Sequence, residues 1–175
     1  MKFTETKLKG AYFIEPELIQ DERGFFARSW CQKEFTEQGL NPNLVQCNIS
    51  FNSQKGTLRG MHYQAQPHPE VKLVRCTIGA IYDVIVDIRP ESPTFKQWVA
   101  VELTSENRKM LYIPEGMAHG FQTLVDHTEV FYQMSEFYHP DCAKGLRWDD
   151  PEFNIEWLIK QDLIISEKDR SFSLI

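Results

Sequence analysis

The sequence lacks several features that would place it in common protein classes. No apolar run approaches the roughly 18 to 20 residues that a membrane-spanning helix needs, and the first residues show no basic-then-apolar pattern of a secretory signal peptide. Lysine and arginine total 19 against 25 aspartates and glutamates, a formal net charge of −6, so there is no basic excess for general nucleic-acid binding. We therefore expect a cytoplasmic protein that binds neither nucleic acid nor membranes.

Cysteine is also sparse and widely scattered. Cys31, Cys47, Cys76 and Cys142 form no CxxC pair, which excludes a cysteine-rich zinc site and argues against a disulfide framework. Reduced thiols fit a cytoplasmic location. Walker-loop, GxGxxG and GxSxG motifs are absent, so no known phosphate-binding loop or nucleophile elbow is indicated.

What the chain does contain is typical of an antiparallel β protein. Its 175 residues have the length of one domain, with an ordinary 42% of hydrophobic residues. Short runs rich in Val, Ile, Phe and Tyr are separated by turn-forming residues, and they predict strands near 11–14, 25–30, 44–52, 57–64, 71–78, 80–89, 96–103, 110–113, 118–124 and 128–137. A helix is predicted from Gln32 to Gln38, ended by Gly39, and a capping box at Ser166 to Asp169 predicts a short terminal helix. We expect one all-β sandwich or barrel over residues 1–175, with the tail from about 150 packed on it.

Polar side chains on otherwise apolar strand faces are the first candidates for chemistry, because burying an unpaired polar group costs about 1–3 kcal/mol. By alternation, Lys72 shares a face with Val74, and Tyr132 shares a face with Val130 and Met134. Lys72 fits either a lysine that extends to water from a strand edge or an ammonium that stabilises an oxyanion in a barrel mouth. Tyr132 fits either a hydrogen-bonded core tyrosine or a catalytic acid.

Histidines and aspartates on the predicted strands are the second group. His62 and His119 each fit a core histidine as well as a base. Asp83 and Asp87 alternate with isoleucines, a costly placement unless each carboxylate orients a histidine or pairs with an arginine. The remaining histidines lie beside turn-like residues and are predicted to be exposed: His68, His127 and His139.

Basic residues could form a local anion site despite the acidic balance. The candidates, each of which alone would equally fit a solvated surface charge, are Arg23, Arg59, Lys72, Arg75 and Lys168. Arg59 and His62 are three positions apart, so a regular strand would place them on opposite faces. If both reach one site, we expect a bulge near Gly60, where the missing side chain makes the distortion cheap.

A metal site is an alternative use of the histidines. His62, Glu70 and His119 could supply two imidazoles and a carboxylate. Small metal-binding barrels usually take two close histidines from one strand, however, and the segment around His62 offers only one. We expect no metal.

Several blocks of sequence, in order, resemble one enzyme family. They are Asp21–Phe26 (DERGFF), Gly56–Gln64 (GTLRGMHYQ), Lys72–Cys76 (KLVRC), Asp83–Arg89 (DVIVDIR), Ser92–Thr94 (SPT) and Ile113–Phe121 (IPEGMAHGF). Over about residues 10 to 170 the chain resembles the dTDP-4-dehydrorhamnose 3,5-epimerase family. The resemblance implies a cupin-like antiparallel jelly roll, a homodimer that exchanges N-terminal strands, no cofactor, and a nucleotide-linked 4-keto-6-deoxyhexose as substrate.

The same resemblance implies roles for individual residues. His62, paired with Asp169, would be the general base, Tyr132 the general acid, and Lys72 would contact the C4 oxygen. Contacts to the substrate or its diphosphate are implied for Arg23, Gln46, Asn48, Arg59, His119 and Lys168, and Tyr138 matches an aromatic residue that stacks on the nucleobase. Asp169 also fits a simple helix-capping residue.

These residue types suit an epimerase. A C–H bond beside a ketone is acidic because the resulting anion spreads onto the oxygen, so inversion needs a base on one face, a cation at the oxygen and an acid on the other face. Two positions depart from the family pattern: Arg28 stands where many members have Glu, and Cys47 where many have Asp. Open alternatives are a metal-dependent cupin enzyme, a non-catalytic sugar-nucleotide-binding module and a 3,4-ketoisomerase on the same scaffold.

Overall fold

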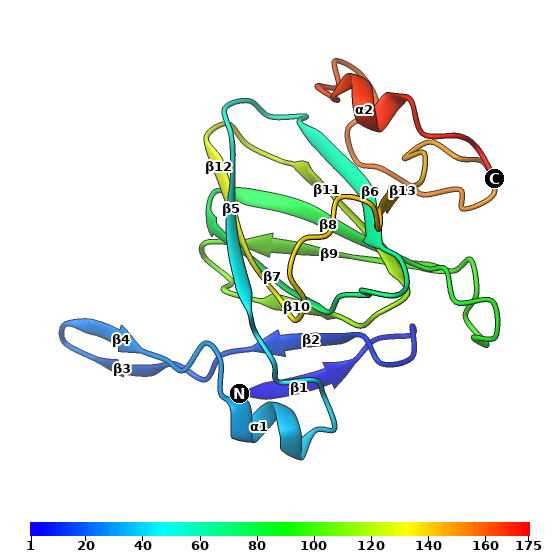
Figure 1. Ribbon diagram of the computed structural model, residues 1–175. Coiled ribbons are helices and arrows are strands. Elements are labelled where there is room, and N and C mark those ends of the chain that lie inside the picture. The colour runs from blue at the N-terminus through cyan, green and yellow to red at the C-terminus, as the bar shows by residue number, and fades with distance from the viewer.

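The computed structural model describes residues 1–175 and consists almost entirely of antiparallel strands (Figure 1). In chain order the elements are β1 (Lys2–Glu5), β2 (Tyr12–Glu15), β3 (Ile19–Asp21), β4 (Gly24–Phe26), α1 (Gln32–Glu37), β5 (Gln46–Asn52), β6 (Leu58–Gln64), β7 (Lys72–Ile78), β8 (Ala80–Asp87), β9 (Trp98–Thr104), β10 (Met110–Ile113), β11 (Met117–Thr123), β12 (Thr128–Met134), β13 (Ala143–Gly145) and α2 (Glu167–Arg170). No helix is long and apolar enough to cross a membrane.

Two sheets form the body of the molecule. One has six strands in the order β1-β2-β10-β7-β12-β5, and the other has five in the order β13-β6-β11-β8-β9. Buried residues from both sheets form one core cluster, with Val74 and Val130 from the first sheet and Ile81, Ile85 and Phe121 from the second. The sandwich confirms the predicted jelly-roll architecture.

The outer face of the five-stranded sheet is covered as well. Phe153 and Trp157, from the irregular tail, pack with Leu58, Val84 and Val86 in a second buried cluster. Both faces of this sheet are buried. Val84, Ile85 and Val86 of β8 are therefore all apolar, instead of alternating with polar residues. The tail after residue 150 thus lies against the sheet that carries β6.

Three short strands were not predicted, and several predictions were too long, since 80–89 and 128–137 run two and three residues past the ends of β8 and β12. The predicted strand at 25–30 is β4, which ends at Phe26 and pairs only with β3 in a separate hairpin. β1 and β13, of four and three residues, carry too few positions to show an alternating pattern. The predicted helix end is confirmed, since Gly39 follows α1 with φ of 71°, a conformation that glycine adopts without strain. Ser166 caps α2 as predicted, accepting a hydrogen bond from the Asp169 backbone N–H at 3.1 Å.

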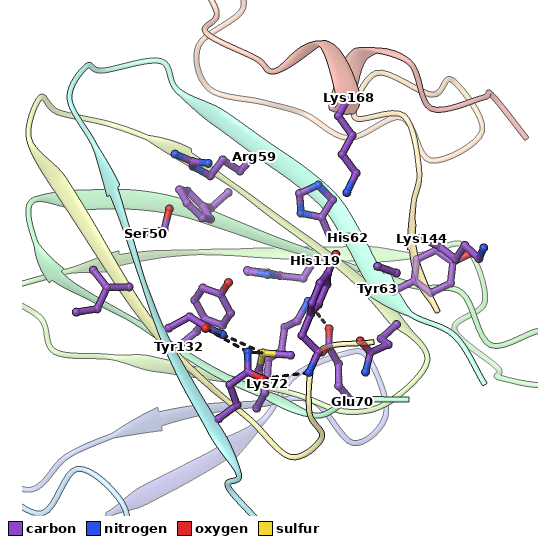
Figure 2. A pocket seen from close by; sticks show the side chains of 18 of the residues that line it. Ser50, Arg59, His62, Tyr63, Glu70, Lys72, His119, Tyr132, Lys144 and Lys168 are labelled. Atoms are coloured by element: carbon purple, nitrogen blue, oxygen red, sulfur yellow. Dashed lines mark hydrogen bonds and ion pairs between the residues drawn. The ribbon is translucent and has the colours of Figure 1, made fainter. Parts of the chain in front are cut away.

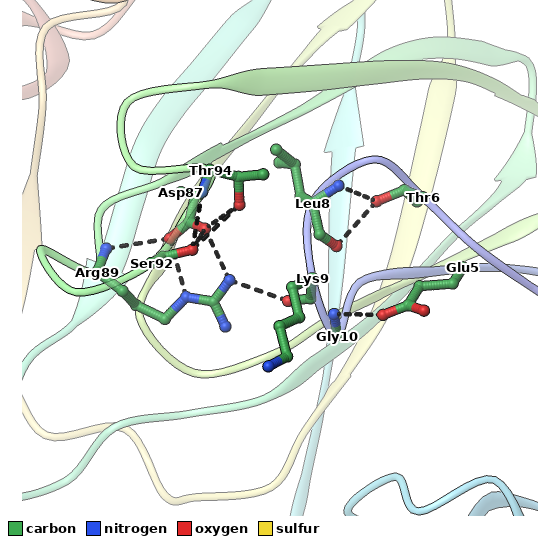
Figure 3. Close-up of polar contacts among 9 residues, drawn as sticks. All are labelled: Glu5, Thr6, Leu8, Lys9, Gly10, Asp87, Arg89, Ser92 and Thr94. Atoms are coloured by element: carbon green, nitrogen blue, oxygen red, sulfur yellow. Dashed lines mark hydrogen bonds and ion pairs between the residues drawn. The ribbon is translucent and has the colours of Figure 1, made fainter.

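A buried ionic network fixes the loop after β8 (Figure 3). Asp87 is fully buried and accepts hydrogen bonds from Arg89 Nε at 2.8 Å and from the hydroxyls of Ser92 and Thr94 at 2.5 and 2.7 Å. Arg89 also donates to the Lys9 carbonyl at 2.9 Å, which ties this loop to the turn between β1 and β2. Burial opposes ionisation, but these hydrogen bonds outweigh it and hold the pKa of Asp87 well below its usual range. The prediction that Asp87 requires a charged partner is confirmed.

Candidate active site

Strands of both sheets line an open pocket of about 550 Å³ (Figure 2). Most of the site residues expected from the sequence lie in its wall: Gln46, Asn48, Arg59, His62, Lys72, His119, Tyr132, Tyr138 and Lys168. β6 and β11 of the five-stranded sheet supply one side, and β5, β7 and β12 of the six-stranded sheet supply the other.

A bulge in β6 brings Arg59 and His62 into the same pocket. His62 pairs with His119 on β11, but Arg59, three positions before His62, pairs with the residue only two positions after His119, so β6 holds one extra residue there. Gly60 sits in this irregularity with φ of 138°, and a Cβ on it would lie 2.5 Å from Gly120 Cα. Only glycine fits this close approach of two strands. The predicted bulge near Gly60 is confirmed.

His62, in the pocket wall, forms a close pair with Asp169, which lies outside the pocket. His62 Nε2 lies 2.7 Å from Asp169 Oδ1, and the Gly60 backbone N–H donates to Asp169 Oδ2 at 3.2 Å. The Asp169 side chain is 5% exposed and that of His62 is 40% exposed, so the imidazole faces the pocket while the carboxylate stands behind it. Burial opposes ionisation of Asp169, but the hydrogen bond from His62 and the charge on that ring outweigh it and lower the carboxyl pKa. Asp169 lies in the helix that Ser166 caps, but its carboxylate contacts His62 and the Gly60 N–H, so the side chain itself holds His62.

Lys72 points into the pocket and is held by a carboxylate. Its Nζ lies 2.8 Å from Glu70 Oε1, with the two side chains 11% and 7% exposed. Glu70 Oε2 is buried and has no hydrogen-bond partner. Of the two interpretations offered by the sequence, extension of Lys72 to water is wrong, because the whole residue is buried at the start of β7.

Tyr132 stands on the neighbouring strand of the same sheet. β12 pairs with β7 so that Tyr132 lies opposite Val74 and Met134 opposite Lys72, which places the phenol and the ammonium on one inward face. Figure 2 shows the Tyr132 hydroxyl directed into the pocket. Burial raises the pKa of Tyr132, and the nearby Glu70 raises it further. The phenol therefore stays protonated at neutral pH.

His119 lies deeper, between these groups. Its Nε2 is 2.7 Å from Asp83 Oδ1, and both residues are buried. The sequence required a partner for Asp83, and His119 is that partner. Because the aspartate accepts from one ring nitrogen, it fixes the orientation of an imidazole that faces the pocket with its other edge.

The metal site considered from the sequence does not form. His62 and His119 direct their Nε2 atoms to separate aspartates, and Glu70 pairs with Lys72, so these three residues do not gather their ligand atoms in one place. The arrangement does not favour a metal-dependent cupin enzyme.

Two predicted anion-site residues lie outside the pocket of their own chain. Arg23 occupies the turn of the β3–β4 hairpin, 84% exposed and ion-paired with Asp21. Arg75 is half-buried, and its guanidinium stacks over the Phe131 ring at 4.9 Å. Two positions depart from the family pattern. Arg28 is ion-paired with Glu34 of α1, and Cys47 is exposed on β5.

Some pocket residues were missed. Ser50 follows Gln46 and Asn48 at two-residue spacing on β5, and that alternation was a usable signal. Lys144 lies on β13, which is too short for its pattern to be read, and Tyr63 neighbours it in the pairing of β13 with β6. The exposure predictions also need correction: His127 is exposed, but His68 and His139 are half-buried and stack on one another at 3.6 Å between ring centroids.

Comparison with known proteins agrees with this geometry. A family model described as dTDP-4-dehydrorhamnose 3,5-epimerase matches residues 5–175. The protein of that name from Methanothermobacter thermautotrophicus is 47% identical over 173 residues, which cover 98% of this chain and 92% of the relative. The Escherichia coli protein of the same name is 42% identical over 176 residues. The match covers 99% of this chain and 95% of the Escherichia coli protein.

Solved structures of similar proteins superpose closely. The Bacillus anthracis dTDP-4-dehydrorhamnose 3,5-epimerase with TDP and PPi bound has a TM-score of 0.95 at 44% identity and covers 99% of both chains. A Legionella pneumophila epimerase in complex with dTDP-4-keto-L-rhamnose has a TM-score of 0.93 at 40% identity, covering 99% of this chain and 92% of that one. With a cupin-like jelly roll and a match over nearly its whole length, the chain belongs to the dTDP-4-dehydrorhamnose 3,5-epimerase family.

Proposed function

We propose that this protein is an isomerase that inverts C3, C5 or both in a dTDP-linked 4-keto-6-deoxyglucose without a cofactor. Inversion of both carbons gives the 4-dehydrorhamnose form. One observation carries the proposal: His62 and Tyr132 come from different sheets and line the same pocket, with Lys72 on the Tyr132 side. A flat enolate between the two sheets would meet a base on one face and an acid on the other.

In the first step His62 removes the proton from the carbon beside the C4 ketone. The negative charge of Asp169, 2.7 Å behind the ring, stabilises the imidazolium that forms. The buried carboxylate with its lowered pKa stays ionised throughout the neutral range, so it orients the imidazole without carrying the proton itself. Positioned proton transfer of this kind contributes about 10²–10⁴-fold to a rate.

The charge that leaves the carbon collects on the C4 oxygen. The Lys72 ammonium is the cation that would stabilise it, because the group is buried and held in place by Glu70 at 2.8 Å. A fixed charge in a partly dry site is worth more than one in water, and loss of a comparable donor costs about 10²–10³ in rate. His119, oriented by Asp83, would add a hydrogen bond to the sugar beside it.

Tyr132 completes the inversion by returning a proton from the opposite side. Its raised pKa keeps the hydroxyl protonated until it is needed. The phenolate left behind is reprotonated from solvent through the open mouth of the pocket, and His62 loses its proton by the same route, so both residues return to their starting state. Repeating the cycle at the second carbon would give double epimerisation.

The rest of the pocket would hold the nucleotide. Gln46, Asn48, Arg59 and Lys168 line it, and Asn52 Oδ1 orients the guanidinium of Arg59 by accepting a hydrogen bond from its Nε at 2.8 Å. The Arg59 and Lys168 cations suit a diphosphate. Tyr138 is 53% exposed at the rim, where its ring is free to stack on a base.

We also propose a homodimer in which the hairpins are exchanged. The β3–β4 hairpin projects away from the body (Figure 1), with Ile19 69% and Phe26 73% exposed. β5 is the edge strand of its sheet and exposes Ile49 and Phe51, at 64% and 51%. Large exposed apolar side chains on a projecting hairpin and an unpaired edge favour burial against a second copy. In that arrangement Arg23 would reach the diphosphate in the partner's pocket.

Two further expectations accompany this function. We propose that residues 1–175 fold as a single domain, with the tail from about 150 as part of it, and that the protein works in the cytoplasm. Cytoplasmic nucleotide sugars would then be its source of substrate. Limited proteolysis, which spares a single domain, and fractionation of the producing cells test these two statements.

The test of the function is turnover of a defined substrate. Incubation with dTDP-4-keto-6-deoxyglucose, followed by reduction of the ketone and NMR of the products, should give sugars inverted at C3, C5 or both. CDP- and GDP-linked keto sugars serve as competitors for nucleobase preference. Recovery of the unchanged configuration at both carbons would refute the proposal, and tight binding without turnover would instead indicate a binding module.

A further inference from the structure

A cluster outside the pocket brings two imidazoles and a carboxylate together. The rings of His68 and His139 stack at 3.6 Å between centroids with 6° between their planes. Glu136 bridges them, since its Oε2 lies 3.8 Å from His68 Nδ1 and its Oε1 lies 3.8 Å from His139 Nε2. The three potential ligand atoms all lie within 4.8 Å of one another. None of these three residues lines the catalytic pocket.

One buried side chain holds the two backbone segments that carry this cluster. Gln64, 5% exposed at the end of β6, donates to the carbonyls of His68 at 2.7 Å and Phe137 at 3.0 Å, and accepts from the His139 N–H at 2.8 Å. Glu136 is held in turn, because its Oε1 accepts from the Phe137 N–H at 2.7 Å. The segments are therefore fixed before any ligand binds, which is the preorganisation that a metal site needs.

The side chains retain enough freedom to close on an ion. His68, His139 and Glu136 are 39%, 36% and 33% exposed, so an ion and its water can enter from solvent. Bonds of about 2.0–2.2 Å to nitrogen and oxygen place tetrahedral ligand atoms roughly 3.3 Å apart, which the 3.8 Å separations reach with a small inward movement. One imidazole must also tilt out of the stack, because lone pairs in parallel rings do not converge.

We propose that His68, Glu136 and His139 form a binding site for a divalent transition-metal ion of the zinc type. Two imidazoles and one carboxylate are ligands of intermediate softness, which suit Zn²⁺ and Co²⁺ better than the all-oxygen preference of Mg²⁺ or Ca²⁺. The ion links the segment before β7 to the segment after β12. Tyr138 lies between two of the ligands, so the ion fixes the segment that carries this rim tyrosine. It takes no part in the proton transfers.

Zn²⁺ titration of metal-free protein tests the site, and the chain offers a matched control. The wild type should bind one equivalent of Zn²⁺ per chain, and Co²⁺ should give the visible absorption of a four-coordinate ion. His68→Ala, His139→Ala and Glu136→Gln should each weaken binding at least tenfold. His127→Ala should bind as the wild type does, because His127 is exposed and stacks only on Phe51.

Thermal unfolding gives a second readout that does not depend on activity. One equivalent of Zn²⁺ should raise the melting temperature of the wild type and of His127→Ala, but not that of Glu136→Gln. Unchanged affinity in all three ligand variants would overturn the proposal. So would binding that is lost in His62→Ala but kept in His68→Ala, because that ion would occupy the catalytic pocket. These measurements use Zn²⁺ and Co²⁺ alone, so they stand apart from the outcome of the epimerase assay.

Discussion

Removing the charge behind His62 tests the proposed dyad directly. The Asp169→Asn change keeps the size of the side chain but replaces a buried carboxylate with a neutral amide. The distance from His62 Nε2 to Asp169 Oδ1 is 2.7 Å, which places the centres of the two charges about 4 Å apart once the ring is protonated. Two unit charges at that separation interact by about 4 kcal/mol at an effective dielectric constant of 20.

Solvent reduces this figure, because His62 is 40% exposed. We take about 2–4 kcal/mol as the stabilisation lost in the transition state, which corresponds to a fall in kcat of about 30- to 1,000-fold at 1.36 kcal/mol per tenfold. KM should change little, because Asp169 does not line the pocket. Steady-state kinetics on the dTDP-linked keto sugar measure both parameters.

A second variant in the same helix controls for loss of structure. Glu167→Gln removes an exposed carboxylate two positions away in α2 and should leave kcat within about twofold of the wild type. Circular dichroism and thermal unfolding show whether both variants keep the fold. A fall of less than fivefold in Asp169→Asn, or an equal fall in both variants, would refute the orienting role of Asp169.

Three other predictions follow from charged and titrating groups. In a pH–rate profile, the loss of activity at high pH should lie above pH 10, because burial raises the pKa of Tyr132 and the phenol must be protonated; a fall centred near pH 8 would contradict this. Asp87→Asn should lower the free energy of unfolding by about 3 kcal/mol in urea at pH 7, since it leaves Arg89 without its buried partner. The lowered pKa of Asp87 means that the wild type has this contribution above about pH 4 and loses it as the pH falls further, so equal stability of the two proteins at pH 7 would be inconsistent with the network. Glu70→Gln should lower kcat about tenfold with a smaller effect on KM, because it frees Lys72 from the ion pair that positions it; the idea fails if kcat is unchanged.

The long strands could be predicted from the sequence because their apolar residues extend over many positions, alternating in β12 and nearly continuous in β8. β7, β8 and β12 each have seven or eight residues, with apolar positions that recur on one face. The three- and four-residue strands β1, β3 and β13 could not, since their pairing is set by neighbouring strands rather than by their own pattern. Tertiary contacts determine these elements.

The site was predictable in its parts but not in its assembly. Alternation placed Tyr132 and Lys72 on inward faces, and the three-residue offset between Arg59 and His62 required the bulge that β6 contains. Nothing local links His62 to Asp169, which lies 107 positions later in the chain, and only the resemblance to a family suggested that pair.

Other features could not be read from the sequence, for physical reasons. Arg23 carries a charge suited to a diphosphate, but its hairpin points away from the pocket of its own chain, and a sequence does not show which copy a residue serves. His68 and His139 lie beside turn residues, yet Gln64 draws their segments together and half-buries both rings. Long-range hydrogen bonds of this kind leave no periodic trace in the sequence.

In the proposed mechanism an imidazole and a phenol act on opposite faces of one enolate. Incubating dTDP-4-keto-6-deoxyglucose in D₂O, and locating deuterium and configuration at C3 and C5 by NMR, tests this arrangement. The wild type should give deuterium and inversion, His62→Ala neither, and Tyr132→Phe deuterium without inversion. Full inversion by Tyr132→Phe, or continued exchange by His62→Ala, would contradict the mechanism.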